Sequence, residues 1–225
     1  MTKGVLVAIE GIDGAGKTTQ AGLLEAALRS GGYRVVSTKE PTNGQWGRQL
    51  RASATAGRLS PQEELDLFIK DRREHVAGLI TPSLDAGMVV IVDRYYYSTA
   101  AYQGARGMDP DALIRLNEEF ARRPDLLVVL DVEPQLGLKR IRQRGDRAND
   151  FEQESGLLEA ARIFRALDLP FLARIDGTLP QSDITAGILE LLYDGPLVGR
   201  PVRPSRIPGR PEVPGDLWME LSKVR

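Results

Sequence analysis

The sequence contains no cysteine, and this absence removes several classes of protein from consideration. Without Cys among its 225 residues, the chain cannot be a disulfide scaffold or use thiol chemistry. An excess of one charge is also missing, because the formal net charge is −1, and this argues against a general nucleic-acid or membrane surface. No apolar run approaches the ~20 residues of a membrane span. We therefore expect a cytoplasmic soluble enzyme that binds neither nucleic acid nor membrane.

The composition that remains is ordinary for a globular protein. Hydrophobic residues make up 42% and charged residues 27%, and the length suits one α/β domain with a large core, or a domain with a short appendage. The texture changes at residue 194, because residues 195–214 are rich in Pro, Gly and Arg and show no periodicity. We expect a domain over residues 1–193 and an extended tail over residues 194–225.

Short apolar runs alternate with helical patterns along the predicted domain. The predicted strands cover residues 5–9, 33–38, 88–92, 126–131 and 171–175. The predicted helices cover residues 18–30, 48–57, 61–86, 97–122 with a break at 104–110, 134–147, 157–167 and 182–192. This alternation predicts an α/β fold with a parallel sheet and helices on both faces, in which ligands bind at the carboxyl ends of the strands.

After the first predicted strand, residues 11–18 read Gly-Ile-Asp-Gly-Ala-Gly-Lys-Thr. This is the P-loop pattern G-x-x-x-x-G-K-[ST], in the strand–loop–helix setting that the motif requires. Its glycines let backbone N–H groups point at phosphate oxygens, and the positive end of the following helix faces the same anion. We expect Lys17 to reach the β- and γ-phosphates of ATP and Thr18 to ligate Mg²⁺. The predicted nucleotide-binding residues are Gly11, Ile12, Asp13, Gly14, Ala15, Gly16, Lys17, Thr18 and Thr19.

Other candidate residues leave two interpretations open. Asp93 and Arg94 end the third strand, where they either serve the metal and phosphates or form a strand-end salt bridge. Phe68 and Arg72 lie one helical turn apart on one face, where they either stack and read a base, or are a core Phe beside a solvated Arg. The basic stretch 139–147 is either a solvated helical face or a lid that supplies a transition-state arginine.

The joint order and spacing of these residues resemble the thymidylate kinase family of P-loop nucleoside monophosphate kinases over residues 4–192. The resemblance rests on residues 10–20, Lys39-Glu40-Pro41, Gly47-x-x-Leu50-Arg51, Phe68-x-x-x-Arg72, Asp93-Arg94-Tyr95 with Ser98, Ala101-Tyr102-Gln103-Gly104, Pro124-Asp125-Leu126 and Gly137-Leu138-Lys139-Arg140. It implies a three-layer P-loop kinase fold with a five-stranded parallel sheet and an arginine-rich lid. It also implies ATP and Mg²⁺ as cofactors, dTMP as the acceptor, and a homodimer.

The resemblance also assigns roles to residues on the acceptor side. Asp13, which would repel the phosphates unless it faced another partner, contacts the 3′-hydroxyl of the acceptor. Phe68 stacks on thymine, and Arg72 bonds its O4 atom. By the same resemblance, Arg51 and Arg94 hold the dTMP phosphate, and Thr99 reads thymine N3 or O2. Tyr102 crowds the 2′ position of the sugar. Asp93 orients the ligands around the magnesium ion. The full predicted acceptor set is Asp13, Glu40, Pro41, Arg51, Phe68, Arg72, Arg94, Ser98, Thr99, Tyr102 and Gln103.

Gly14 bears on the source of the catalytic cation. Some family members carry an arginine at this position, and others have Gly and supply the arginine from the lid, as this chain is expected to do. Arg147 is favoured and Arg144 comes second, although Asp150 stands where a commoner lid pattern has Arg before its aromatic–Glu pair. The predicted catalytic residues are Asp13, Lys17, Arg94, Arg144 and Arg147.

The leading interpretation is therefore transfer of the γ-phosphate of ATP to dTMP, giving dTDP for dTTP synthesis. One alternative is a kinase for another nucleoside monophosphate on the same fold, against which Phe68, Arg72 and Tyr102 argue. The other is a non-catalytic nucleotide-binding regulatory module. Intact Lys17 and Asp93 favour catalysis, and the guanine-reading Asn-Lys-x-Asp motif is absent.

Overall fold

The computed structural model describes residues 3–57, 59–143 and 150–199 of the chain. Within these ranges the strands form one parallel sheet of five, in the order β2-β3-β1-β4-β5. The strands are β1 (Val5–Glu10), β2 (Val35–Lys39), β3 (Val89–Asp93), β4 (Leu126–Asp131) and β5 (Leu172–Asp176). The chain order changes direction beside β1, so the loop after β1 lies at the switch point where such sheets bind ligands. The predicted five-stranded parallel sheet is confirmed.

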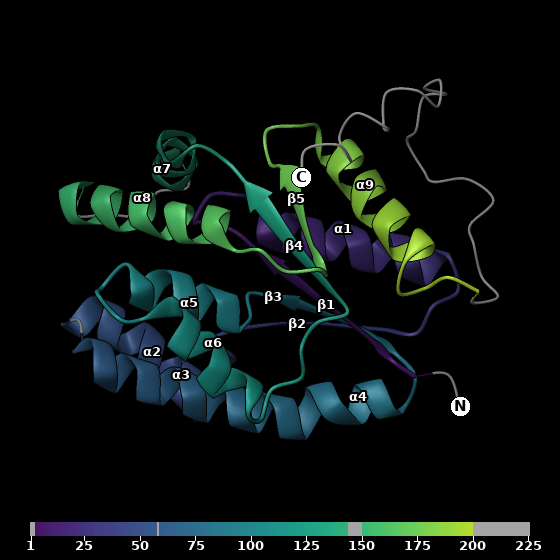
Figure 1. Cartoon of the computed structure of the whole chain (residues 1–225), viewed down its shortest axis with the longest axis horizontal. Helices are drawn as coiled ribbons and strands as arrows, with labels where there is room; N and C mark the ends of the chain where they lie inside the picture. The colour runs from purple at the N-terminus through teal and green to yellow at the C-terminus, as the bar shows by residue number, and fades with distance from the viewer. Residues whose placement is uncertain (1–2, 58, 144–149, 200–225) are drawn as a thin grey trace.

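Helices cover both faces of the sheet (Figure 1). On one face α1 (Lys17–Ser30) packs against α9 (Gln181–Asp194), and on the other α5 (Tyr96–Gly104) packs against α8 (Asp150–Ala166). The outer helices on the α5 side are α2 (Gln45–Ala56), α3 (Pro61–His75), α4 (Thr81–Asp85) and α6 (Pro110–Glu118), and α7 (Pro134–Gln143) follows β4. The architecture is thus the three-layer arrangement that the alternating pattern predicts.

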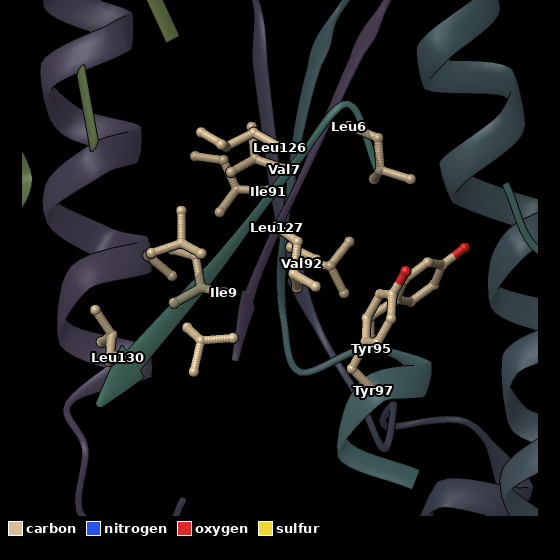
Figure 2. Packing of buried hydrophobic residues seen from close by; sticks show 14 of the residues in the cluster. Leu6, Val7, Ile9, Ile91, Val92, Tyr95, Tyr97, Leu126, Leu127 and Leu130 are labelled. Atoms are coloured by element: carbon tan, nitrogen blue, oxygen red, sulfur yellow. The ribbon is translucent and has the colours of Figure 1, made fainter. Parts of the chain in front are cut away.

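The core lies on both faces of the central strands. All six residues of β1 and all five of β3 are buried, as expected for strands covered by helices on each side. Figure 2 shows Ile9 and Leu130 pointing toward one helical layer and Tyr95 and Tyr97 toward the other. Tyr95 and Tyr97 directly follow β3, so aromatic packing fixes the chain where it leaves the sheet toward the pocket described below.

Several helices differ in detail from the sequence prediction; α6, for example, ends at Glu118 rather than residue 122. α8 begins at Asp150 rather than residue 157, because Phe151 is the one large apolar residue among its first seven and a single residue gives no periodicity. α2 begins at Gln45 rather than residue 48. The predicted helix 61–86 is a continuous helical rod made of α3, a π-helical segment η1 (Val76–Ile80) and α4; the sequence gives no sign of the wider turn.

The end of α9 continues into the domain core for a few residues. Leu197 is buried, and its N–H donates to the Leu192 carbonyl oxygen at 2.8 Å. Residues 200–225, most of the predicted tail, lie outside the described residues. Within the ranges that the structure describes, no helix combines the length and apolar character needed to cross a membrane.

Candidate functional site

The loop from β1 to α1 has a backbone that only glycine adopts readily. Gly11, Gly14 and Gly16 have φ values of 133°, 81° and 98°, in the left-handed region that strongly disfavours side chains. α1 begins directly afterwards, at Lys17. The N-terminal N–H groups of this 14-residue helix therefore open onto the loop, which is an arrangement that binds phosphate.

Gly14 is also held in close contact with α7. A Cβ atom at position 14 would lie 2.4 Å from the Gly137 carbonyl oxygen and 2.7 Å from its Cα. A Cβ on Gly137 would in turn lie 2.6 Å from the Asp13 carbonyl oxygen. Both glycines are therefore needed for α7 to approach the loop, and an arginine at position 14 does not fit this backbone.

Lys17 folds back over the loop. Its Nζ atom donates to the carbonyl oxygens of Gly11 at 2.9 Å and Ile12 at 2.7 Å, so the ammonium group lies inside the curve of the loop. Burial and the charge of Arg94 together lower the pKa of Lys17 to about 7, although neighbouring carboxylates oppose the shift. A triphosphate at the loop would supply the negative charge that favours the ammonium form.

Thr18 and Asp93 meet across the ends of β1 and β3. The Thr18 hydroxyl donates to Asp93 Oδ2 at 2.5 Å. The other carboxylate oxygen, Asp93 Oδ1, is buried and has no hydrogen-bond partner among the described residues, which is costly unless a ligand completes it. A hydroxyl beside an unpaired carboxylate oxygen fits Mg²⁺, which in nucleotide sites takes one or two protein ligands together with phosphate oxygens and waters. Consistent with so few protein ligands, the described ranges hold no group of three or more His, Cys, Asp or Glu residues arranged for a metal.

Asp13, Arg94 and Tyr102 form a charged cluster between the loop and α5. Arg94 Nη2 donates to Asp13 Oδ1, and the Tyr102 hydroxyl donates to Asp13 Oδ2 at 3.1 Å. Burial acts to raise the pKa of Asp13, but the charges of Arg94 and Lys17 outweigh it and hold the pKa below its usual value. Asp13 is therefore ionised in the cluster. Asp93 and Arg94 do not form the strand-end salt bridge considered as an alternative, because Arg94 pairs with Asp13 instead.

Arg94 takes a strained backbone conformation at the end of β3. Its φ value of 68° is uncommon for a residue with a side chain and carries a free-energy cost of about 1–3 kcal/mol. The Arg94 N–H donates to the Ile9 carbonyl oxygen at 3.0 Å, and Nη1 donates to Ser98 Oγ at 3.3 Å. This conformation directs the guanidinium toward the loop and the pocket beside it.

A pocket of about 210 Å³ adjoins this cluster. It lies between the loop after β1, the end of β2, α3 and α5, at the carboxyl edge of the sheet. Its lining consists of Asp13, Glu40, Pro41, Glu64, Phe68, Arg72, Arg94, Tyr95, Ser98, Thr99, Tyr102 and Gln103. All predicted acceptor residues except Arg51 therefore line one pocket next to the phosphate loop.

Arg72 is buried at the base of this pocket and fully engaged by the protein. Its Nε donates to Glu40 Oε2 at 2.7 Å, its Nη1 to Asn117 Oδ1 at 2.6 Å and its Nη2 to Thr99 Oγ1 at 3.0 Å. The other Glu40 oxygen lies 2.9 Å from His75 Nδ1. The alternative of a solvated Arg72 is therefore wrong. Nη2 also lies 2.7 Å from Glu40 Oε2, so of the five N–H groups only the second one on Nη1 remains for the pocket.

Gln103 presents a buried acceptor to the same pocket. Its Nε2 donates to Glu64 Oε2 at 2.5 Å, and the same carboxylate oxygen accepts from Arg106 Nη1 at 2.5 Å. The amide oxygen, Gln103 Oε1, is buried without a hydrogen-bond partner among the described residues. Like Asp93 Oδ1, it is an acceptor that needs a donor from a ligand.

Glu10, the last residue of β1, forms hydrogen bonds that connect this strand to the start of α5. Its Oε1 accepts from the backbone N–H groups of Tyr95 at 2.7 Å and Ser98 at 3.0 Å, and its Oε2 accepts from Ser98 Oγ at 2.5 Å. Complete burial raises the pKa of this carboxyl to about 7, against the lowering effect of these hydrogen bonds. Glu10 thus holds the N-terminal turn of α5, which positions Ser98 beside Arg94.

Some predicted site residues lie elsewhere. Arg51 is exposed on α2, where it donates to the carbonyl oxygens of Pro41 at 3.0 Å and Thr42 at 2.7 Å, at the rim rather than in the pocket. Arg144 and Arg147 lie outside the described residues. Arg140 donates to the carbonyl oxygens of Gly14 at 3.1 Å and Gly177 at 3.2 Å, so this lid arginine contacts the phosphate loop itself.

Sequence reasoning assigned no role to Glu64, His75 and Asn117. A signal for the first two was present, because Glu64 precedes Phe68 by four residues and His75 follows Arg72 by three. These spacings place all four side chains along one face of α3. Asn117 gave no signal, because it lies on a separate helix 45 residues from Arg72.

Comparison with known proteins identifies the family of the chain. The family model for thymidylate kinase matches residues 9–173. The chain is 57% identical to the thymidylate kinase of Xanthomonas campestris pv. campestris (strain B100) over 175 residues, which cover 78% of this chain and 77% of that protein. It is 51% identical to the thymidylate kinase of Xylella fastidiosa (strain M12) over 191 residues, which cover 85% of this chain and 88% of that protein. The chain belongs to the thymidylate kinase family.

Proposed function

We propose that the chain transfers the γ-phosphate of ATP to dTMP, giving ADP and dTDP. The observation that carries this proposal is the position of the pocket. It shares Asp13 with the phosphate loop and Arg94 with the charged cluster, so an acceptor phosphate held by Arg94 would lie next to the γ-phosphate. Holding both reactants in this geometry is the largest contribution that a protein makes to phosphoryl transfer.

The other end of the pocket suits a thymine base. Phe68 is partly buried and lines the pocket, where its ring can stack on a base. Thymine carries acceptors at O2 and O4 and a donor at N3. The remaining Nη1–H group of Arg72 complements O4, and the unpaired Gln103 Oε1 complements the N3–H group. Thr99 accepts from Arg72, which leaves its hydroxyl hydrogen for O2.

Asp13 and Tyr102 complement the sugar. Tyr102 is held by the Asp13 carboxylate and by the Asp13 N–H, which donates to the Tyr102 hydroxyl oxygen at 2.9 Å. We propose that Asp13 accepts from the 3′-hydroxyl of the acceptor, and that the Tyr102 ring excludes a 2′-hydroxyl. The acceptor phosphate is already ionised, so the transfer itself needs no general base.

Charge on the transferring group is neutralised by cations of the chain. Lys17 lies within the loop, and Arg94 faces it from β3. Since Gly14 has no room for a side chain, we propose that a further arginine comes from the lid, with Arg147 first and Arg144 second. We also propose that Thr18 and Asp93 would hold Mg²⁺, which would neutralise charge on the phosphates when bound.

Three further points are proposed, the first on the resemblance and the other two on the composition of the chain. The enzyme is a homodimer, it acts in the cytoplasm where ATP is available, and residues 1–193 form the kinase unit. Light scattering on the purified chain tests the first point, because a dimer has twice the 24.7 kDa mass of the chain.

A coupled ADP-release assay with a panel of nucleoside monophosphates tests the proposed function. We expect dTMP to be the preferred acceptor, dUMP to follow because it lacks only the methyl group, and dCMP, dAMP and dGMP to be poor. Turnover should require a divalent cation. Equal turnover of all acceptors, or none with any of them, would contradict the proposal.

A further inference from the structure

The orientation of the Gln103 side-chain amide is fixed by the chain itself. An amide has a donor end and an acceptor end that are nearly equal in size, so its hydrogen-bond partners decide which end faces a ligand. Here the partner is Glu64 Oε2, which already accepts from the Arg106 guanidinium at 2.5 Å and accepts from Gln103 Nε2 at the same distance. An oxygen in this position accepts and does not donate. The amide nitrogen must therefore face Glu64, and the amide oxygen must face the pocket.

Contacts from three segments hold the Glu64 oxygen in place. Glu64 lies in the first turn of α3, and Gln103 lies near the end of α5. Arg106, just beyond α5, also donates from Nη2 to the Leu59 carbonyl oxygen at 2.7 Å, in the segment before α3. Glu64 and Arg106 are largely buried, with side-chain exposures of 14% and 18%. The pair is thus shielded from solvent and fixes the amide within a rigid frame.

This orientation separates two pyrimidines that have nearly the same shape. Thymine and uracil carry N3–H, a donor that the inward-facing Gln103 Oε1 would accept. Cytosine carries a bare N3 acceptor at the same place and would set two acceptors against each other in a buried site. A buried polar group left without a partner is costly, and sites built around such a bond reject the mismatched analogue strongly.

We propose that the Glu64–Arg106 pair is a positioning device that locks the Gln103 amide and thereby excludes cytosine nucleotides from the acceptor site. The inference rests on the proposed function, because it requires that the base of the acceptor lies against Gln103. The Glu64–Arg106 pair explains a preference that contact with Gln103 alone does not explain. Without the pair, the Gln103 amide could flip and form a hydrogen bond with either pyrimidine.

The test replaces Glu64 with Met, which has a side chain of similar length and removes the oxygen that accepts from Gln103 and Arg106. Gln103 can then flip to present its N–H₂ group to the N3 atom of cytosine. We expect the ratio of kcat/KM for dCMP to that for dTMP to rise about tenfold or more. The KM for ATP should stay within about twofold, because the change lies outside the phosphate loop. The matched control is Glu74→Met, the same substitution at an exposed position of α3, which should leave the ratio unchanged.

Two further variants make the outcome decisive. Gln103→Leu removes the amide, and if it leaves the dCMP-to-dTMP ratio unchanged, the base does not lie against Gln103 and that part of the proposed function fails. If Gln103→Leu changes the ratio while Glu64→Met does not, the base contact stands and the positioning role of Glu64 is overturned. Should Glu64→Met fail to fold in thermal unfolding, Glu64→Leu supplies the same test, since it also removes the oxygen that holds the amide. A rise in the ratio with either Glu64 variant supports the proposal.

Discussion

The two ends of the site are built in different ways. At the phosphate end, eight consecutive residues bend the backbone so that N–H groups and Lys17 converge, and few side chains are involved. At the acceptor end, side chains from the loop after β1, the end of β2, α3 and α5 converge on one pocket. The difference reflects the ligands. A triphosphate is recognised by charge and oxygen geometry alone, whereas a base must be distinguished from others of similar shape by placed donors and acceptors.

This contrast predicts that changes at the phosphate end reduce turnover with every acceptor. The largest effect is expected for Arg147→Ala. If Arg147 neutralises charge on the transferring group, its loss should slow the chemical step about 10³-fold with little change in ATP affinity, because the contact strengthens only in the transition state. Single-turnover kinetics measure this step, and Arg162→Ala, at an exposed position of α8, is the control. Wild-type chemistry in both Arg147→Ala and Arg144→Ala would remove the lid from the mechanism.

Lys17→Ala comes next in size. Loss of the ammonium group that the loop encloses should lower kcat/KM by about 10²–10³-fold, or roughly 3–4 kcal/mol. The loss should be equal for dTMP and dUMP, because Lys17 does not line the acceptor pocket. Lys70→Ala, which removes an exposed lysine from α3, is the control. Near-normal turnover without Lys17 would show that the loop does not hold the triphosphate.

At the acceptor end, Glu40→Ala should affect folding and base binding together. Glu40 is buried between Arg72 and His75, and its removal leaves a buried guanidinium without its counter-charge, which costs about 3–5 kcal/mol. Urea unfolding measures this loss, and the KM for dTMP should rise while that for ATP stays the same. Removing the acid of the more exposed Arg29–Glu25 pair by Glu25→Ala should cost less than about 1 kcal/mol. Equal losses in the two variants would mean that the Arg72 network does not stabilise the fold.

Glu10 lies between the phosphate end and the acceptor end of the site. Its raised pKa leads us to expect that the stability of the protein depends on pH. Burial raises its pKa from 4.5 to about 7, so the folded chain holds the proton more tightly than the unfolded chain. Its contribution is fully present below pH 4.5 and is lost as pH rises through about 7, by on the order of 3 kcal/mol. Glu10→Gln cannot ionise. The difference in unfolding free energy between the two proteins should therefore grow from pH 4.5 to 7 and then level off. Parallel pH profiles would contradict this account.

Phe68→Ala should have the smallest effect and the most selective one. Loss of base stacking is worth about 1–3 kcal/mol, so dTMP affinity should fall while ATP affinity is unchanged. Phe120→Ala is the control, because Phe120 packs partly buried against the core away from the pocket and should reduce stability without weakening dTMP binding. If the two variants behave alike, Phe68 is a packing residue.

The two ends also differ in how much the sequence predicts. The sheet could be predicted from the alternation of strands and helices. The phosphate loop could be predicted from a contiguous motif whose glycines allow positive φ values. The approach of Gly14 to Gly137 could not be predicted, because 123 residues separate them in sequence and only the packing of α7 brings them together.

The acceptor pocket was predicted only through the family resemblance. Spacing on α3 suggested Phe68 and Arg72, but the partners that orient Arg72 lie on other elements. A buried arginine and a solvated one look the same in a helical pattern, so the sequence leaves that choice open. Residues that act through others, such as Glu64 behind Gln103, become visible only when hydrogen-bond partners are known.

A crystal structure of the chain with dTMP and a non-hydrolysable ATP analogue tests the central claim most directly. The account predicts the triphosphate on the loop of residues 11–18, the thymine between Phe68 and the Arg72–Gln103 wall, and the dTMP phosphate within hydrogen-bond distance of Arg94. A dTMP molecule bound outside this pocket, or bound with its base toward the phosphate loop, would contradict it.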